Sequence, residues 1–121
     1  MHPSQNNVIY HNPRCSKSRQ TLELLERHGV NLTIIEYLQA PPSVAELGIL
    51  CNLLGVHPLA ICRTKEAQFK ALGLSQDDDR PATEWLQLMV ANPILIERPI
   101  VVYKNRVALG RPPENVLTLL D

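Results

Sequence analysis

The sequence has few aromatic residues and no net charge, and both shortages exclude classes of protein. Phe, Trp and Tyr make up 4% of the 121 residues, which is too few for a platform on which nucleic-acid bases would stack. Twelve basic and twelve acidic side chains cancel, so bulk attraction to DNA or to an anionic membrane is not expected. We therefore predict neither nucleic acid nor a membrane among the partners.

Long hydrophobic runs are also missing. No apolar stretch approaches the roughly 20 residues needed to cross a bilayer, and the polar residues 1–7 lack the apolar core of a signal peptide. We therefore expect a cytoplasmic protein. The apolar fraction of 45% is still enough for a packed interior, and we expect a single domain over residues 1–121.

Cysteine is scarce and occurs in an odd number. Cys15, Cys51 and Cys62 show no Cys-x-x-Cys spacing and no grouping with histidine at metal-ligand spacing. A disulfide scaffold and a structural metal site are therefore not expected. A free reactive thiol can persist in the reducing cytoplasm that we expect for this chain.

The first third of the chain alternates between strand and helix patterns. Val8–His11 and the β-branched run Leu32–Tyr37 are typical of strands. Between them, Ser16–His28 has leucines at helical spacing, and Gly29 is suited to end that helix. A strand, a helix and a strand in this order predict a βαβ unit with parallel strands and a right-handed crossover.

The rest of the chain predicts a helical region, a hairpin and a closing helix. Pro41 and Pro42 break the chain, and Ser43 with Glu46 forms the pattern of a capping box. The whole order, βαβ, helices, ββα, is similar to a thioredoxin-like α/β fold with a helical insertion. The predicted elements of this part are helices Ser43–Leu54, Pro58–Arg63, Lys65–Leu72 and Pro81–Ala91, strands Ile100–Tyr103 and Val107–Leu109, and helix Glu114–Leu120.

Cys15 lies between the first predicted strand and the helix that begins at Ser16. A thiol at the start of a helix faces backbone N–H groups without intrahelical partners and the positive end of the helix dipole. Both favour the thiolate, which is the nucleophilic form, and the same N–H groups can hold an anion. The alternative is a buried, inert thiol, which is what most free cysteines are.

The neighbours of Cys15 favour the reactive interpretation. They are polar or turn-forming, so we expect an exposed site. Lys17, Arg19 and His11 supply positive charge that is expected to lower the pKa of the thiol further. His11 is equally consistent with a residue that satisfies backbone groups at the end of its strand.

Ser18 follows Cys15 by three residues and lies on the same face of the predicted helix. Its hydroxyl can hydrogen-bond the thiolate or a bound oxyanion. Serine cannot form the disulfide that a second cysteine at this position would form, so Cys15 needs an external thiol to complete a redox cycle. Cys51 lies on the apolar face of its predicted helix, where core packing is the better interpretation.

Three arginines have settings that suggest anion binding. Arg63 ends a predicted helix, Arg98 precedes Pro99, and Arg111 lies between the last strand and the last helix. In a thioredoxin-like sheet the loop before the third strand approaches the active thiol, so we expect Arg98 near Cys15. Guanidinium groups bind tetrahedral oxyanions with two parallel hydrogen bonds, so a cluster of them would bind arsenate or phosphate.

Three segments carry a resemblance to a known family. They are YHNPRCSKSR (Tyr10–Arg19), PILIERPIVV (Pro93–Val102) and the shorter GRP (Gly110–Pro112). The chain resembles the glutaredoxin-coupled arsenate reductase (ArsC) family, and most of all its YfgD-type members, from about Val8 to Leu120. Ser16-Lys17 differs from the Gly-Thr pair of plasmid-borne arsenate reductases.

The resemblance implies a thioredoxin-like fold with a helical insertion, a cis Pro99, and no bound metal or organic cofactor. It implies that Cys15 is the nucleophile, supported by His11 and Ser18. The implied substrate is arsenate or a similar oxyanion, glutathione is the co-substrate, and glutaredoxin is the protein partner. The residues that it implies for oxyanion binding are Arg63, Arg98 and Arg111.

Two other functions fit the same fold. One is a redox-responsive regulator that binds RNA polymerase and resembles the Spx family, although most of those proteins carry a second cysteine where this chain has Ser18. The other is a glutathione-dependent thiol oxidoreductase that needs no oxyanion. Arsenate reduction is the leading hypothesis, because Cys15 is accompanied by the three arginines.

Overall fold

The computed structural model describes residue 3 and residues 5–121. The chain forms two compact units, which we describe separately. The first contains the chain up to Ala40 together with Arg98–Asp121, and the second contains Pro41–Glu97. The second unit corresponds to the predicted helical insertion, and the single domain over residues 1–121 stays a prediction.

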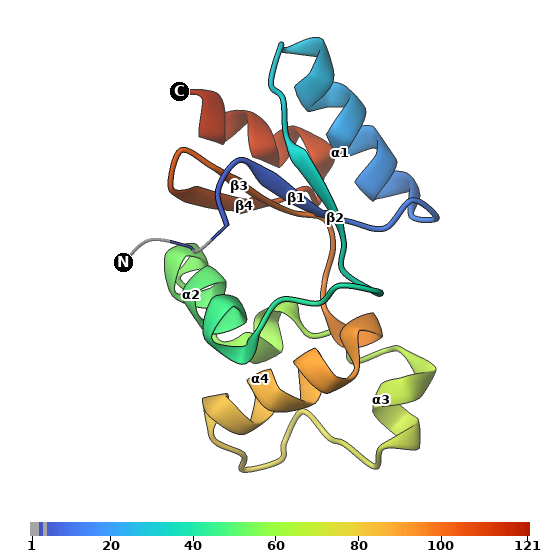
Figure 1. The fold of residues 1–121 in the computed structure, drawn as a ribbon. Helices are drawn as coiled ribbons and strands as arrows, with labels where there is room; N and C mark the ends of the chain where they lie inside the picture. The colour runs from blue at the N-terminus through green and yellow to red at the C-terminus, as the bar shows by residue number, and fades with distance from the viewer. Residues whose placement is uncertain (1–2, 4) are drawn as a thin grey trace. The chain divides into compact units, whose positions relative to one another are not determined.

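The first unit is built on a four-stranded sheet (Figure 1). Its strand order is β2-β1-β3-β4; β1 and β2 are parallel, while β3 is antiparallel to both of its neighbours. The parallel pair and the hairpin confirm the predicted βαβ and ββ arrangements. The strands are β1 (Val8–His11), β2 (Thr33–Glu36), β3 (Ile100–Tyr103) and β4 (Arg106–Leu109).

Two helices cover one face of this sheet. Helix α1 (Ser16–Arg27) begins after Cys15 and ends before Gly29, whose φ of 73° suits a residue without a side chain. The closing segment η3 (Pro113–Leu120) is a 3-10 helix and lies beside α1 in Figure 1. The sequence predicted a helix over Glu114–Leu120; the structure begins it at Pro113 and winds its eight residues in the tighter 3-10 geometry.

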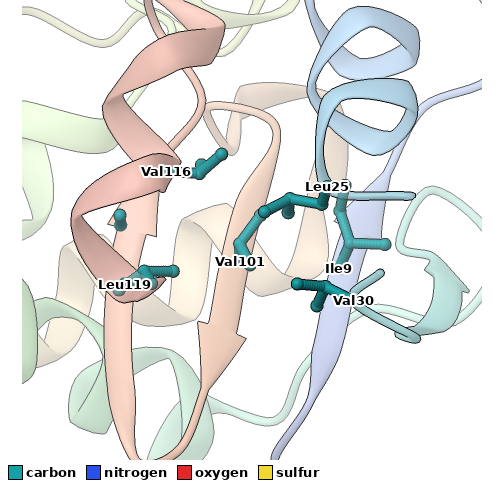
Figure 2. Close-up of a cluster of buried hydrophobic side chains, with 7 residues drawn as sticks. Ile9, Leu25, Val30, Val101, Val116 and Leu119 are labelled. Atoms are coloured by element: carbon teal, nitrogen blue, oxygen red, sulfur yellow. The ribbon is translucent and has the colours of Figure 1, made fainter. Parts of the chain in front are cut away.

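The core of the first unit lies between the sheet and these helices (Figure 2). Its side chains come from three strands, from the last turn of α1, from Val30 after that helix, and from η3. Burying them removes apolar surface from water, which is the main stabilising contribution to the fold. The fully or nearly fully buried members are Ile9, Leu25, Val30, Val101, Ala108, Val116 and Leu119.

The second unit is helical. Helix α2 begins with the predicted cap, because the Ser43 side chain accepts a hydrogen bond from the Glu46 N–H at 3.0 Å, and ends at Gly55 with a φ of 72°. Element η1 ends before the predicted Arg63, α3 is shorter than the predicted Lys65–Leu72 at both ends, and η2 was not predicted. The elements are α2 (Val44–Leu54), the 3-10 helix η1 (Pro58–Ile61), α3 (Ala67–Ala71), α4 (Ala82–Ala91) and the 3-10 helix η2 (Pro93–Leu95).

Backbone hydrogen bonds join the segments after η1 and after η2. The Glu97 N–H donates to the Ile61 carbonyl at 2.8 Å, and the Arg63 N–H donates to the Leu95 carbonyl at 2.7 Å. Phe69 stacks on the buried Trp85 at a centroid distance of 6.1 Å. These contacts fix the backbone of Arg63 within its unit.

The fold agrees with the mixed α/β, thioredoxin-like architecture with a helical insertion that the sequence predicted. The Arg98–Pro99 peptide bond is cis, as the resemblance implied, and so is Arg111–Pro112, which the sequence did not indicate. Among the described residues, no helix combines the length and the apolar character that crossing a membrane requires.

Candidate active site

A tight turn between β1 and α1 positions Cys15. The Asn12 carbonyl accepts the Cys15 N–H at 3.0 Å, which closes a β-turn with Pro13 at its second position. The Asn12 side chain also accepts the Arg14 N–H at 3.0 Å. Proline at this position fixes φ, and asparagine stabilises the turn through its own side chain, so the local sequence specifies this conformation.

Cys15 occupies the N-cap position of α1. Its φ of −96° and ψ of 122° are the extended values typical of that position. The backbone N–H groups of Lys17 and Ser18 point toward the sulfur. These N–H groups lower the pKa of the thiol, although the sulfur does not make the capping hydrogen bond that a serine or aspartate oxygen makes at a helix start.

The pKa of Cys15 is lower than that of an ordinary thiol, although burial acts in the opposite direction. Burial raises the pKa because it disfavours the charged form, but the Ser18 N–H, the Arg98 guanidinium and the Lys17 N–H together outweigh it. Arg98 acts both through its charge and through a hydrogen bond to the thiol. The thiolate is thus available at a lower pH than in an unfolded chain.

Two expectations about this thiol were wrong. Cys15 is 8% exposed, so the site is not open as its polar neighbours predicted. The positive charge that lowers its pKa comes from Arg98, which is distant in sequence, and not from the expected group of Lys17, Arg19 and His11. The turn folds the side chain inward while its flanking residues Arg14 and Ser16 stay exposed.

Ser18 and His11 form a buried pair beside Cys15. The Ser18 hydroxyl lies 2.6 Å from His11 Nδ1 and accepts the Asn12 N–H at 3.1 Å. Ser18 therefore contributes its backbone N–H to the thiol, while its side chain links strand β1 to the turn. This is a more indirect role than the predicted bond from its hydroxyl.

The surroundings of His11 favour its neutral form. Burial lowers its pKa below the usual value, Arg19 lowers it further, and the Glu36 carboxylate acts in the opposite direction. The lowered pKa disfavours the cationic form of His11, so of the two interpretations it favours the supporting one over an electrostatic effect on the thiol. Its contact with Ser18 makes it a group that supports the turn.

Arg98 precedes β3 and Arg111 follows β4, so both lie at the open end of the hairpin that these strands form. The Arg111 Nη1 donates to the Arg98 carbonyl at 3.3 Å, and the Gly110 N–H donates to the Pro99 carbonyl at 3.0 Å. These bonds hold the start of β3 against the end of β4. Within the first unit, the structure therefore brings Cys15, His11, Ser18 and Arg98 together, with Arg111 bound to the backbone of Arg98.

Arg63 belongs to the second unit. Its Nη2 lies 3.2 Å from a Glu66 carboxylate oxygen, and its Nη1 donates to the Ile94 carbonyl at 3.3 Å. Both contacts lie inside that unit. The predicted role of Arg63 in oxyanion binding stays a prediction.

Gly110 is a residue of the site that the sequence analysis missed. A Cβ there would stand 2.7 Å from Pro99 Cγ and 2.8 Å from Thr21 Cγ2, which is closer than real contacts allow. Thr21 in turn donates to the Lys17 carbonyl at 2.8 Å. Gly110 therefore lets the end of β4 approach both α1 and the cis proline that follows Arg98, and a glycine at a strand end is the signal for such an approach.

The other two cysteines have raised pKa values, in contrast to Cys15. Cys51 and Cys62 are buried, and burial raises the pKa of each to about 11, with Glu97 adding to the effect at Cys62. Both therefore stay protonated and inert near neutral pH. Core packing, predicted for Cys51, is confirmed by its 3% exposure.

The lowered pKa of Cys15 leads to a measurable pH dependence. We expect the rate of alkylation by iodoacetamide to reach half its maximum below the ordinary thiol pKa of about 8.5. Arg98→Gln removes the nearby positive charge, so its alkylation curve should shift to higher pH. Arg106→Gln removes an equal charge from the exposed start of β4 and serves as the control; a shift of equal size in both variants would contradict the assignment to Arg98.

The described residues contain no group of three or more His, Cys, Asp or Glu side chains that could hold a metal ion. The chemistry that the site can perform with its own residues is nucleophilic attack by sulfur on an anionic electrophile. The thiolate supplies the electron pair, and Arg98 offsets the negative charge that such an electrophile brings.

Comparisons with known proteins agree with this site. The model of the ArsC family matches residues 10–119. The YfgD protein of Escherichia coli (strain K12) is 45% identical over 113 residues, which are 93% of this chain and 94% of that protein. An arsenate reductase of Haemophilus influenzae is 44% identical over 114 residues, which are 93% of this chain and 97% of that protein.

A solved structure has a similar fold. The arsenate reductase from Vibrio cholerae superposes with a TM-score of 0.87 at 47% identity, over 93% of this chain and 95% of that one. The residues that the family model matches include the Cys15 turn, Arg98, Arg111 and the cis Pro99. The chain belongs to the ArsC family.

Proposed function

We propose that this protein is an arsenate reductase that uses glutathione and glutaredoxin as its sources of thiol. The observation that carries the proposal is the single thiolate at the start of α1 with the Arg98 guanidinium beside it. Similarity to relatives named arsenate reductase over more than nine-tenths of the chain supports arsenate as the electrophile.

In this proposal the site binds arsenate before the reaction. The oxyanion lies at the N-terminus of α1, where backbone N–H groups and the helix dipole favour negative charge. Arg98 and Arg111 bind its oxygens through charge-assisted hydrogen bonds, and Arg63 is the third predicted ligand. This arrangement offsets the repulsion between the arsenate and the thiolate of Cys15.

The proposed cycle begins when the Cys15 thiolate bonds to the arsenic of dihydrogen arsenate; one hydroxyl takes the proton of the other and leaves as water. The thiol of glutathione then releases its proton and bonds to the Cys15 sulfur as the sulfur–arsenic bond breaks. The electron pair of that bond stays on arsenic, so As(V) becomes As(III) and leaves as arsenite. A glutaredoxin thiol finally takes the glutathionyl group and restores the free Cys15.

Ser18 explains why external thiols are needed. A second cysteine at this position would form a disulfide with Cys15, whereas serine cannot. Cys51 and Cys62 stay protonated because burial raises the pKa of each to about 11. Glutathione and glutaredoxin therefore supply both the resolving thiol and the reducing electrons.

A reconstituted assay tests the proposal. The purified chain is mixed with arsenate, glutathione, glutaredoxin, glutathione reductase and NADPH, and arsenite is quantified by chromatography with mass spectrometry. We expect arsenite to accumulate with matching NADPH consumption, and turnover to fall sharply when glutathione or glutaredoxin is omitted.

The same assay separates the alternatives. Reduction of a glutathione mixed disulfide with no arsenite formed from arsenate would replace the proposal with a thiol oxidoreductase. Absence of both activities, together with recovery of RNA polymerase on the immobilised chain, would replace it with a regulator. Arsenite formation that is independent of thiols would also contradict the proposed cycle.

A further inference from the structure

A hollow of about 410 Å³ lies at the carboxyl ends of β1 and β2. These two strands are parallel and in register, with His11 opposite Glu36. In open α/β sheets, ligands bind outside the carboxyl ends of parallel strands, and the volume falls within the usual range for small-molecule sites. The lining residues are His11, Asn12, Pro13, Arg14, Glu36, Leu38 and Gln39.

The hollow shares its wall with the turn that positions the nucleophile. Asn12, Pro13 and Arg14 belong to the β-turn whose last residue is Cys15. The opposite wall comes from the segment that follows β2. A ligand in the hollow therefore lies against the turn that presents the reactive sulfur.

The charges in the hollow suit a ligand that carries both signs. Arg14 and Glu36 are exposed, and neither forms an ion pair with another residue of the described chain. Arg14 can bind a carboxylate with two parallel hydrogen bonds, and the Glu36 carboxylate can bind an ammonium group. A simple anion such as arsenate would be attracted by one of these charges and repelled by the other.

The remaining lining suits a short peptide. Leu38 is 42% exposed, and the exposed Pro13 ring offers a second apolar surface for methylene groups. Gln39 provides an amide that can donate to and accept from peptide bonds. A zwitterionic tripeptide with an aliphatic stem and two peptide-like bonds uses each of these features.

We propose that this hollow is the binding site of glutathione, with the γ-glutamyl ammonium on Glu36 and a carboxylate on Arg14. The inference rests on the proposed function, which requires glutathione to reach Cys15, and it assigns the residues that hold it. The co-substrate then binds on the β2 side of the turn that carries Cys15, held through its ammonium group and one of its two carboxylates.

The test measures binding without turnover. S-methylglutathione, which cannot form a disulfide, is titrated into the full chain by isothermal calorimetry. We expect Arg14→Gln and Glu36→Gln each to weaken binding about tenfold, because each removes one charge-assisted contact. The matched controls Arg106→Gln and Glu26→Gln change exposed charges outside the hollow and should leave the affinity unchanged.

A modified ligand assigns Glu36 to the ammonium group. N-acetyl-S-methylglutathione lacks that charge, so the wild-type chain should bind it about tenfold more weakly than S-methylglutathione. Glu36→Gln should bind the two ligands equally, whereas Arg14→Gln should keep the preference. Equal preference in the wild type and Glu36→Gln would overturn the assignment.

The outcomes separate this inference from the proposed function. If arsenite forms with glutathione but the two hollow variants bind S-methylglutathione as the wild type does, the inference is wrong and the function stands. The same holds if the wild type shows no binding. If arsenate is not reduced but S-methylglutathione binds and the variants weaken it, the function is wrong and the hollow is still a glutathione site.

Discussion

Replacing Cys15 with serine is expected to abolish arsenate reduction, lowering turnover by at least about 10⁴-fold, as removal of a catalytic nucleophile does in other enzymes. A serine hydroxyl remains protonated where the Cys15 thiol ionises, and oxygen cannot accept the redox change that sulfur undergoes. Arsenite formation in the reconstituted assay measures the loss.

The same variant should preserve the fold. Cys15 makes no side-chain capping hydrogen bond, whereas serine is among the preferred N-cap residues and can accept a backbone N–H of the first turn. We expect the unfolding midpoint of Cys15→Ser to equal or exceed that of the wild type, while Cys15→Ala, which offers no acceptor, should be less stable than Cys15→Ser by about 1 kcal/mol.

Cys51→Ala is the control for the loss of a thiol as such. Its sulfur is buried and protonated, so the variant should keep arsenate turnover even though the core loses contacts. Retained turnover in Cys15→Ser, or equal losses in Cys15→Ser and Cys51→Ala, would contradict the assignment of the nucleophile.

Adding a single methyl group at Gly110 is expected to have the largest effect on stability. In Gly110→Ala the new Cβ would stand 2.7 Å from Pro99 Cγ and 2.8 Å from Thr21 Cγ2, and neither group belongs to a flexible chain end. Overpacking of this kind typically costs about 1–3 kcal/mol, which urea denaturation measures directly. Displacement of Pro99 also moves the preceding Arg98, so the pKa of Cys15 should rise in the same variant.

Two further variants test whether steric contact with Thr21 and Pro99 causes the expected destabilisation of Gly110→Ala. Thr21→Ala removes the threonine atoms that the new methyl group would meet, so Gly110→Ala combined with Thr21→Ala should be less destabilised than the sum of the single changes. Gly48→Ala is the matched control, because its Cβ would meet only Leu86 Cδ1 at 3.4 Å inside helix α2. It should be neutral or stabilising by up to about 1 kcal/mol, and an equal loss at Gly48 and Gly110 would refute the steric explanation.

The sequence predicted the features that depend on neighbouring residues. Asn12 and Pro13 specify a turn, Ser43 and Glu46 specify a helix start, and Gly29 and Gly55 specify helix ends; the structure confirms the helix start and both ends. The position of Cys15 at the start of α1 follows from the same local rules. For this reason the amino-acid sequence alone predicts the nucleophile and the order of elements.

The features that depend on distant contacts were predicted less well. The approach of Arg98 to Cys15 across 83 positions was expected from the thioredoxin-like fold and is confirmed. The burial of Cys15 was not expected, nor was it expected that Arg98, and not Lys17, Arg19 and His11, supplies the side-chain charge that lowers its pKa. Gly110 is required because three segments meet there, and no single segment reveals this. Glu36 was overlooked because it lines the hollow only through the register of β1 and β2.

The cap position of Cys15 couples the ionisation of the thiol to the folding equilibrium. Because the pKa of Cys15 lies lower in the folded chain than in the unfolded chain, the folded state holds the thiol proton less tightly. The free energy of unfolding therefore increases as the pH rises from the folded pKa to the unfolded pKa, and the gain is lost again as the pH falls. The N–H groups and the guanidinium that favour the thiolate of Cys15 therefore also stabilise the folded state at every pH at which the thiol is ionised. A change that lowers the pKa of the nucleophile should for the same reason raise the free energy of unfolding at that pH.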